Sequence, residues 1–334
     1  MSAAPWLSLL FPMYRVERWL ADCIASLAPQ LDAGIELVFV DDASPDGSAA
    51  LVERLLPQAR LIRQPENRGV SAARNRLLDA ARGDYLWFID PDDLVEPGVI
   101  PRLKALLQQH RPDLLTCDFR IFDDNGDDGA STTSVKPRHR HIASFAGPAG
   151  VVMDDVNLRL RGLFVHGQFH PWSKVVRRAC WPAGLRFAEG RIYEDLALYP
   201  RLVLHTPRHL HVAEVWIAYR QRAGSLMSAL DERRLSDWTA ALDGLAAELP
   251  PLDEDTRFEI AHFCARTLLR ARRRRLQLGG AALAGLHADA ERFERSSPLN
   301  RQQLLAAYLW RGRWLRGLQW WRSSAQAWAA PQSR

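Results

Sequence analysis

Three carboxylates follow a short apolar segment in the first third of the chain. Residues 85–89 have the continuous apolar character of a strand covered on both faces, and Pro91 cannot extend a ladder of hydrogen bonds. Asp90, Asp92 and Asp93 would therefore lie at the carboxyl end of a strand, where open parallel sheets bind ligands. Crowded carboxylates repel one another unless a cation neutralises them, and oxygen ligands suit Mg²⁺ or Mn²⁺. The segment predicts a divalent-metal site, with a solvated helix-capping turn as the plainer alternative.

Polar residues also follow three earlier apolar segments. These segments are residues 7–11, 35–40 and 59–63, and the short motifs after them contain Pro12 and Tyr14, Asp41 and Asp42, and Asn67 and Gly69. A helix is predicted after each segment, because apolar residues then recur at steps of three and four. Strands that alternate with helices of this length indicate βαβ units and a mostly parallel sheet. The strand ends would gather these polar residues at one site.

Two further acids, Glu194 and Asp195, begin a predicted helix about a hundred residues after the metal cluster. A carboxylate can take a proton from a reacting group, so either acid is a candidate general base. Side chains adjacent on a helix point about 100° apart, so only one of the two would serve. The alternative is that both acids stabilise the helix N-terminus through its dipole.

Composition limits the class of protein. The chain has 334 residues, is 47% hydrophobic and carries a net charge of +5, which favours a globular, mildly basic protein with an anionic partner. Its four cysteines form no C-x-x-C pair and are predicted to be reduced thiols. No segment has the length of a signal peptide core or a membrane span. A cytoplasmic location is expected, with peripheral contact at the inner face of the cytoplasmic membrane.

The C-terminal part of the chain has a different character. Beyond about residue 230 it is predicted to be helical, and residues 296–334 contain five of the twelve tryptophans and no acidic residue. Trp310, Trp314 and Trp321 share one side of a helix by their spacing, with Leu304, Tyr308, Leu315 and Leu318 on an adjoining face. Tryptophan with arginine suits an anionic membrane surface, whereas the alternative is a helix packed on the rest of the protein. Nucleic acid is not expected as a partner, because no nucleic-acid motif accompanies the arginines.

The order and spacing of these motifs resemble the family 2 glycosyltransferases. The matching segments are SLLFPMY (residues 8–14), VDDASPDGS (40–48), NRGVSAARN (67–75) and FIDPDD (88–93). The segments WSK (172–174), EGRIYED (189–195) and YRQRAGS (219–225) look, more loosely, like bacterial envelope-polysaccharide members. Arg15 departs from the family pattern, which usually has asparagine there.

The resemblance implies a fold and a domain organisation. The fold would be GT-A, an α/β fold with a Rossmann-like, mostly parallel sheet flanked by helices, followed by a helical C-terminal extension. Residues 1–228 would form the GT-A domain, divided into a nucleotide-sugar-binding half (1–120) and an acceptor-binding half (121–228). Residues 229–334 would form a basic, tryptophan-rich helical region.

The resemblance also assigns roles to single residues. Asp195 would be the catalytic base, with Glu194 as its neighbour, and Asp92 would hold the metal with help from Asp90 and Asp93. The nucleotide-sugar would contact Pro12, Tyr14, Asp41, Asp42, Asn67, Gly69, Arg74 and Asp90. The acceptor would contact Trp172, Lys174, Tyr219 and Arg222, although a buried core position is an equal alternative for Trp172.

The implied activity is that of an inverting, hexosyltransferase-type enzyme with Mn²⁺ or Mg²⁺ as cofactor. The donor would be a nucleotide-sugar, with UDP as the first expectation, and the acceptor a saccharide or a lipid-linked glycan in bacterial polysaccharide or lipopolysaccharide synthesis. One rival is a non-catalytic glycan- or lipid-binding protein on a GT-A scaffold. Another is a nucleotidyltransferase, which is disfavoured because no glycine-rich loop followed by arginine or lysine occurs near the N-terminus.

Overall fold

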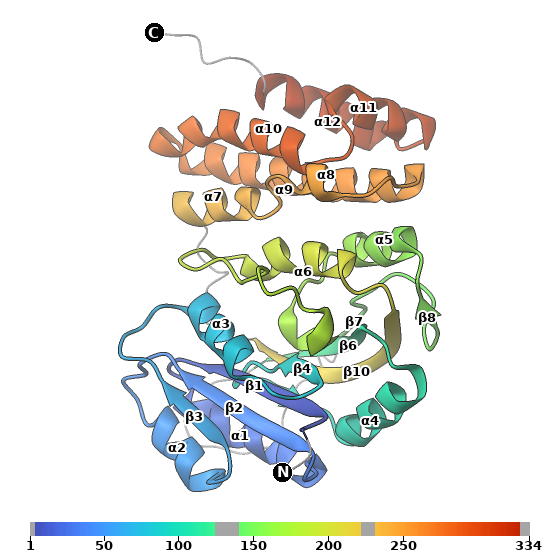
Figure 1. Cartoon of the computed structure of the whole chain (residues 1–334). Helices are drawn as coiled ribbons and strands as arrows, with labels where there is room; N and C mark the ends of the chain where they lie inside the picture. Colours follow the sequence, from blue (N-terminus) through green and yellow to red (C-terminus); the bar gives the residue numbers. More distant parts are fainter. Residues whose placement is uncertain (1–3, 124–139, 222–230, 328–334) are drawn as a thin grey trace.

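A computed structural model describes residues 4–123, 140–221 and 231–327 (Figure 1). Ten strands of these residues form one sheet, in the order β3-β2-β1-β4-β9-β6-β10-β5, with β7 paired to β6 and β8 to β10. Helices cover both faces of this sheet, and the C-terminal helices form further layers beyond one of them. The α/β class predicted from the sequence is confirmed.

The N-terminal half contains the predicted strand–helix units. Its elements are β1 (Leu7–Met13), α1 (Glu17–Leu27), β2 (Ile35–Asp41), α2 (Ser48–Leu55), β3 (Arg60–Arg63), α3 (Val70–Ala80) and β4 (Tyr85–Phe88). All pairs among β3, β2, β1 and β4 are parallel, so their carboxyl ends lie at the same edge of the sheet. This edge carries the polar motifs.

The second half of the sheet is mixed rather than parallel. Its elements are β5 (Leu94–Val95), α4 (Val99–His110), β6 (Leu114–Asp123), β7 (Arg140–Ile142), β8 (Val152–Met153), α5 (Val156–His166), β9 (Lys174–Arg177), α6 (Glu194–Leu204) and β10 (His209–Gln221). Strand β9 lies antiparallel between β4 and β6, whereas β6 and β10 are parallel to each other. Because β9 lies beside β4, the chain just before β9 is close to the strand that precedes Asp90, Asp92 and Asp93.

Pro12 does not end the first strand, contrary to the sequence-based expectation. Strand β1 continues to Met13, whose carbonyl oxygen accepts a hydrogen bond of 2.9 Å from the amide of Asp42 on the β2 side. Backbone groups alternate in direction along a strand, so Pro12 turns toward the β4 side. Pairing with β4 stops at Leu10, and the missing amide hydrogen of Pro12 therefore costs no ladder bond.

The C-terminal region is helical, as predicted. Its helices are α7 (Glu232–Ala240), α8 (Leu245–Glu248), α9 (Glu254–Leu278), α10 (Gly285–Ser296), α11 (Arg301–Trp310) and α12 (Trp314–Ala327). Short 3₁₀ turns occur at Ala28–Gln30, Pro171–Ser173, Arg178–Cys180 and Gly280–Ala284. The long helix α9 packs against α5, and α11 and α12 lie farthest from the sheet (Figure 1).

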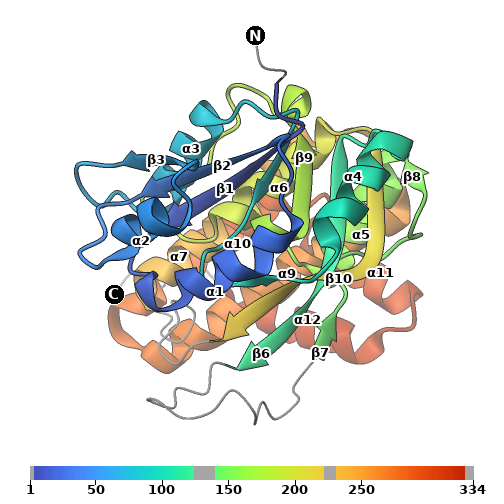
Figure 2. The same cartoon turned by 90° about the horizontal axis from the view of Figure 1, so that it is seen from below.

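Two hydrophobic cores hold the layers together. One lies between the sheet and helices α1 and α4, around residues such as Leu20 and Trp87 (Figure 2). The other runs from Phe88 through Phe164 to Phe258, so the C-terminal helices share a core with the α/β part. The boundary at residues 228 and 229 stays a prediction. All four cysteines are free thiols, as expected.

Candidate active site

The ends of β1 and β2 form the first wall of the site. Asp41 ends β2, is 5% exposed, and accepts a 3.0 Å hydrogen bond from the amide of Ser44. Pro12 is buried in β1, whereas Tyr14 is 41% exposed. The guanidinium of Arg15 lies 5.3 Å from the ring centre of Tyr14. Tyr14 and Arg15 are thus placed at the rim, where a nucleotide base or its phosphates can meet them.

Asp42 fixes the loop before α3. One carboxylate oxygen accepts hydrogen bonds from the side chain of Gln64 (2.6 Å) and the amide of Arg68 (2.8 Å), and the other accepts from the amide of Gly69 (2.7 Å). The side chain of Asn67 donates to the Asp42 carbonyl oxygen at 3.2 Å. Because both carboxylate oxygens are engaged in the loop, the geometry favours a loop-holding role over the predicted nucleotide contact. Gly69 has a φ of +86°, which glycine adopts readily.

Arg74 on α3 joins the two halves of the site. It is 5% exposed and donates one hydrogen bond of 3.1 Å to Asp90 and another to Glu194, which lies 120 residues later in the sequence. Burial lowers the pKa of Arg74, but Asp90, Glu194 and Asp195 outweigh it and raise the pKa overall. The acids after β4 and the acids at the start of α6 therefore meet around one buried cation.

The loop after β4 is tied to β10 by a residue that the sequence did not single out. Arg220 donates its amide to Asp93 (2.9 Å) and its Nε to the carbonyl oxygen of Asp92 (2.8 Å), and its guanidinium lies 3.4 Å from Asp22. Asp93 is fully buried, and burial raises its pKa, as do Asp92 and Asp90. Asp93 thus supports the loop. Arg220 lies within the YRQRAGS segment of the resemblance, which was the available signal.

A three-carboxylate metal site is not formed by the described residues. Among them, no group of three or more His, Cys, Asp or Glu side chains could hold a metal ion. Asp90 is paired with Arg74, and Asp93 is buried against β10. Asp92 is half-buried at the loop and is the remaining candidate. One carboxylate fits a Mg²⁺ or Mn²⁺ ion that takes its other ligands from substrate phosphates and water.

The predicted catalytic acid lies at the start of α6. The residue before the helix, Tyr193, has a left-handed backbone (φ +62°), a strained conformation that a tyrosine keeps only where the surrounding structure holds it. Its ring stacks on Trp238 at 5.6 Å. Asp195 accepts a 2.7 Å hydrogen bond from the amide of Leu196, and its side chain is 21% exposed. Glu194 is 11% exposed and is committed to Arg74, so Asp195 is the more accessible acid.

Two of the predicted acceptor contacts are core residues. Trp172 is 1% exposed and packs edge-on against Phe119 with ring centres 4.5 Å apart, so it cannot offer its face to a sugar in this conformation. Lys174 is also 1% exposed and donates three hydrogen bonds inside the protein. Tyr219 is half-buried and stacks on Trp172 at 5.7 Å. Arg222 lies outside the described residues.

A parallel half-sheet with acids at its strand ends, near an acid pair at the start of a later helix, agrees with the GT-A fold that the sequence predicts. Residues 8–165, just under half of the chain, match the model of "Glycosyl transferase family 2", in agreement with the resemblance seen in the sequence. The GT-A fold is supported by S. aureus TarS 1–349 in complex with UDP-GlcNAc, which superposes with a TM-score of 0.67 at 20% identity over 96% of this chain and 91% of that one.

Glycosyltransferases of bacteria are among the similar sequences. GlyG of Streptococcus pneumoniae is 24% identical over 227 residues, which cover 66% of this chain and 72% of GlyG. EpsJ of Bacillus subtilis is 38% identical over 117 residues, or 34% of each chain. The minor teichoic acid biosynthesis protein GgaB of Bacillus subtilis is 33% identical over 134 residues, or 39% of this chain and 15% of GgaB. The chain therefore spans about a third of EpsJ and less of GgaB. These matches support the predicted class of enzyme, a glycosyltransferase.

Proposed function

We propose that the chain is an inverting glycosyltransferase that moves a sugar from a UDP-sugar to a hydroxyl of a saccharide or lipid-linked acceptor. The observation that carries this proposal is the Arg74 bridge, which puts the acid pair of α6 beside the strand-end acids. A UDP donor is supported by the TarS complexes with UDP-GlcNAc and UDP. A role in bacterial surface polysaccharide synthesis is supported by the name of GgaB, while lipopolysaccharide remains a prediction within that class.

The proposed chemistry divides the work between the two sides of the site. Asp195 accepts the proton of the acceptor hydroxyl as that oxygen attacks the anomeric carbon, and in-line attack inverts the configuration. Asp41 and Tyr14 lie where the nucleotide binds. Asp92 would hold the divalent ion, which when bound would supply positive charge for the departing diphosphate. Arg74 pairs with Asp90 and Glu194, so its positive charge offsets their repulsion of Asp195.

The metal-dependent donor site is tested with UDP itself. Asp92→Asn is expected to weaken UDP binding in the presence of Mn²⁺ by at least about 10-fold, because it removes the carboxylate assigned to the ion. Isothermal calorimetry with Mn²⁺, and separately with EDTA, measures this effect. Asp84→Asn is the matched control, since Asp84 is an exposed aspartate at the opposite end of β4. Absence of UDP, GDP and dTDP binding in both conditions would contradict the donor assignment.

The non-catalytic rival makes a different prediction for turnover. Release of UDP from a UDP-sugar, with water or a glycan as acceptor, is expected of an enzyme. Tight binding of a glycan without turnover of any sugar nucleotide would favour a binding protein. The nucleotidyltransferase rival would instead release pyrophosphate from a nucleoside triphosphate.

The last two helices present an exposed apolar surface, here called the tryptophan face. Its members and their exposed fractions are Trp310 (78%), Trp314 (66%), Leu315 (85%), Leu318 (44%) and Trp321 (53%). The chain turns between α11 and α12, where Gly312 has a φ of +66°, so the single helix expected from the spacing is two helices. Leu304 and Tyr308, which were expected on an adjoining face, are buried.

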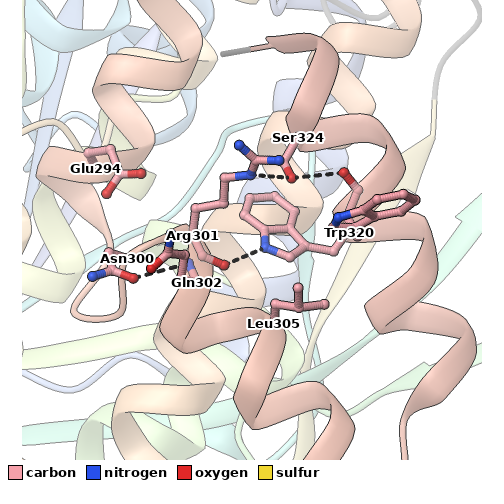
Figure 3. Close-up of a pocket in the computed structure, with 8 residues that line it drawn as sticks. Glu294, Asn300, Arg301, Gln302, Leu305, Trp320 and Ser324 are labelled. Carbon is pink, nitrogen blue, oxygen red and sulfur yellow. Dashed lines mark hydrogen bonds between the residues drawn. The ribbon is translucent and has the colours of Figure 1, made fainter. Parts of the chain in front are cut away.

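The opposite side of α12 is fixed to α11 (Figure 3). The indole of Trp320, which is 1% exposed, donates to the carbonyl oxygen of Arg301 at 3.1 Å, and the Nε of Arg301 donates to Ser324 at 2.8 Å. These three residues line a crevice with Glu294 and Leu305. The tryptophan face is therefore held outward by a packed helix.

We propose that the tryptophan face contacts an anionic lipid surface. Arg316 and Arg322 are exposed beside its members, whereas Arg311 and Arg313 pair with Asp255 and Glu259 of α9. No acidic residue follows Glu294 in the sequence. Tryptophan and arginine together suit the interface of an anionic bilayer. A second copy of the same face would bring arginine against arginine, which is unfavourable. No helix among residues 4–123, 140–221 and 231–327 is long and apolar enough to cross a membrane.

The triple variant Trp314→Ser, Leu315→Ser, Trp321→Ser is expected to lower binding to vesicles that contain about a third anionic lipid by at least roughly 10-fold, because it removes most of the exposed apolar area. Co-sedimentation measures binding. The matched control replaces Leu276, Leu278 and Leu283, which are also exposed, with serine. Equal binding by both variants would contradict the proposal. Self-association that only the first variant abolishes, seen by light scattering, would identify the face as a contact between copies.

A further inference from the structure

The carboxylate of Asp195 is approached from two sides by the protein. Its Oδ1 accepts the hydrogen bond from the amide of Leu196, while its Oδ2 lies 3.8 Å from Nδ1 of His170. The 3.8 Å separation is within ion-pair range and beyond hydrogen-bond range. His170 thus lies beside the proposed base, and the mechanism above gives it no role.

Aromatic side chains hold the imidazole of His170 in place. The ring lies parallel to Trp172, with centres 4.7 Å apart and planes 5° apart, and meets the edge of Phe119 at 5.8 Å. Tyr219 stacks at 6.2 Å. This explains why Trp172 is buried: it supports a histidine rather than a sugar. The side chain of His170 is 39% exposed, so part of the ring reaches solvent beside Asp195.

A buried lysine fixes the backbone that carries His170. Lys174 Nζ donates to the carbonyl oxygens of Gln168 (2.9 Å) and His170 (3.0 Å) and to the hydroxyl of Ser173 (3.0 Å). The hydroxyl of Ser173 also donates to the His170 carbonyl oxygen at 2.9 Å. Nζ lies 4.8 Å from the ring centre of Tyr199 on α6, the helix that Asp195 begins. Lys174 thus connects the turn of His170 to the helix of Asp195.

We propose that His170 is a positioning residue for Asp195, and that Lys174 anchors it. The imidazole directs an N–H toward Oδ2 of Asp195 across 3.8 Å, and the attraction of this dipole to the carboxylate sets the direction of the carboxylate. A neutral imidazole that faces a carboxylate must carry its hydrogen on the facing nitrogen, because two acceptors repel. The proposal rests on the proposed function, in which Asp195 is the base.

Burial favours the neutral form of His170 by lowering its pKa. Lys174 and Arg74 lower this pKa further, against the opposite effect of Asp195 and Asp90. Burial also lowers the pKa of Lys174, to about 7. The other charged or titratable groups near Asp195 are Arg74 on α3, Lys174 on β9, and Tyr193, Glu194 and Tyr199 on α6.

The test is the pH dependence of the rate at which UDP is released from the UDP-sugar that turns over fastest. Water serves as the acceptor if no glycan acceptor has been found. His170→Ala is expected to lower kcat about 10-fold or more and to move the acid limb of the rate profile to higher pH by roughly 0.5–1 unit. The reason is that a carboxylate without a neighbouring donor binds its proton more tightly. His170→Gln keeps an N–H donor, so the acid limb of its rate profile is expected to lie close to that of the unaltered protein. His166→Ala is the matched control, because His166 is exposed and lies four residues earlier.

Three results would separate the inference from the proposed function. If Asp195→Asn retains turnover, the base assignment is wrong, and the inference falls with it. If Asp195→Asn loses turnover but His170→Ala behaves like His166→Ala, only the inference is overturned. A lower kcat with an unmoved acid limb would also overturn it, because that result indicates a purely structural role. Calorimetric UDP binding reports whether each variant is folded, and His170→Gln replaces His170→Ala if the latter does not fold.

Discussion

Replacement of Asp195 by asparagine is expected to lower sugar transfer by about 10²–10⁴-fold while UDP affinity stays within about 2-fold of the unaltered protein. Asparagine keeps the size of the side chain and can still accept the hydrogen bond from Leu196, but it cannot take a proton from the acceptor. The loss should therefore appear in kcat. Steady-state rates of UDP release and calorimetric titration with UDP measure the two quantities on the same protein.

Glu194→Gln is the informative comparison for this variant. Glu194 is bonded to Arg74 and is nearly buried, so its replacement should disturb the bridge and weaken UDP binding rather than remove the base. If Glu194→Gln loses turnover with UDP binding intact, and Asp195→Asn does not, Glu194 is the base. The structure favours Asp195 because its carboxylate is the more exposed of the two.

Replacement of Arg74 by methionine is expected to lower the free energy of unfolding by about 3–5 kcal/mol. It is also expected to abolish turnover of the UDP-sugar. The methionine fills a similar volume but leaves the carboxylate of Glu194 buried without its partner and Asp90 without its ion pair. Urea unfolding at pH 7 measures the change. Arg76→Met is the matched control, since Arg76 lies on the same helix and is exposed.

The loss of stability in Arg74→Met should depend on pH. Burial already raises the pKa of Glu194 above its ordinary value, although Arg74 opposes the shift. Without Arg74, the folded protein would hold that proton up to a higher pH than the unfolded chain does. Between the unfolded and folded pKa values the folded state binds more protons, so its stability falls as pH rises. The deficit should be smaller at pH 5 than at pH 7, and the double variant with Glu194→Gln should recover part of it. An equal deficit at both values would contradict this account.

The strand ends could be predicted from the sequence because each depends on local pattern. Continuous apolar segments followed by Asp41 or Asp90 define both the strand and the edge at which it ends. Parallel pairing then brings those edges together. The return of Asp195 to this edge was expected only from the family resemblance, since nothing local to residues 193–196 indicates it.

Contacts between distant segments could not be predicted in this way. Asp42 and Asp93 look like ligand-binding acids in the sequence, yet their partners are the amides of the loop before α3 and of β10. A sequence pattern records that an acid follows a strand and does not record which backbone amide will meet it. Trp172 is a similar case, because its burial depends on the packing of Phe119 and His170.

The Arg74–Glu194 bond also bears on how such enzymes diversify by recombination. The two residues are 120 positions apart, and the match to the family model, residues 8–165, contains the arginine but not the glutamate. A chimera that took its first 120 residues from one relative and the remainder from another would inherit the two partners from different parents. If either parent lacked its member of the pair, the hybrid would bury a charge without a counterion. The halves of this chain are therefore exchangeable only between relatives that share both residues, and substitution at one position should be compensated at the other.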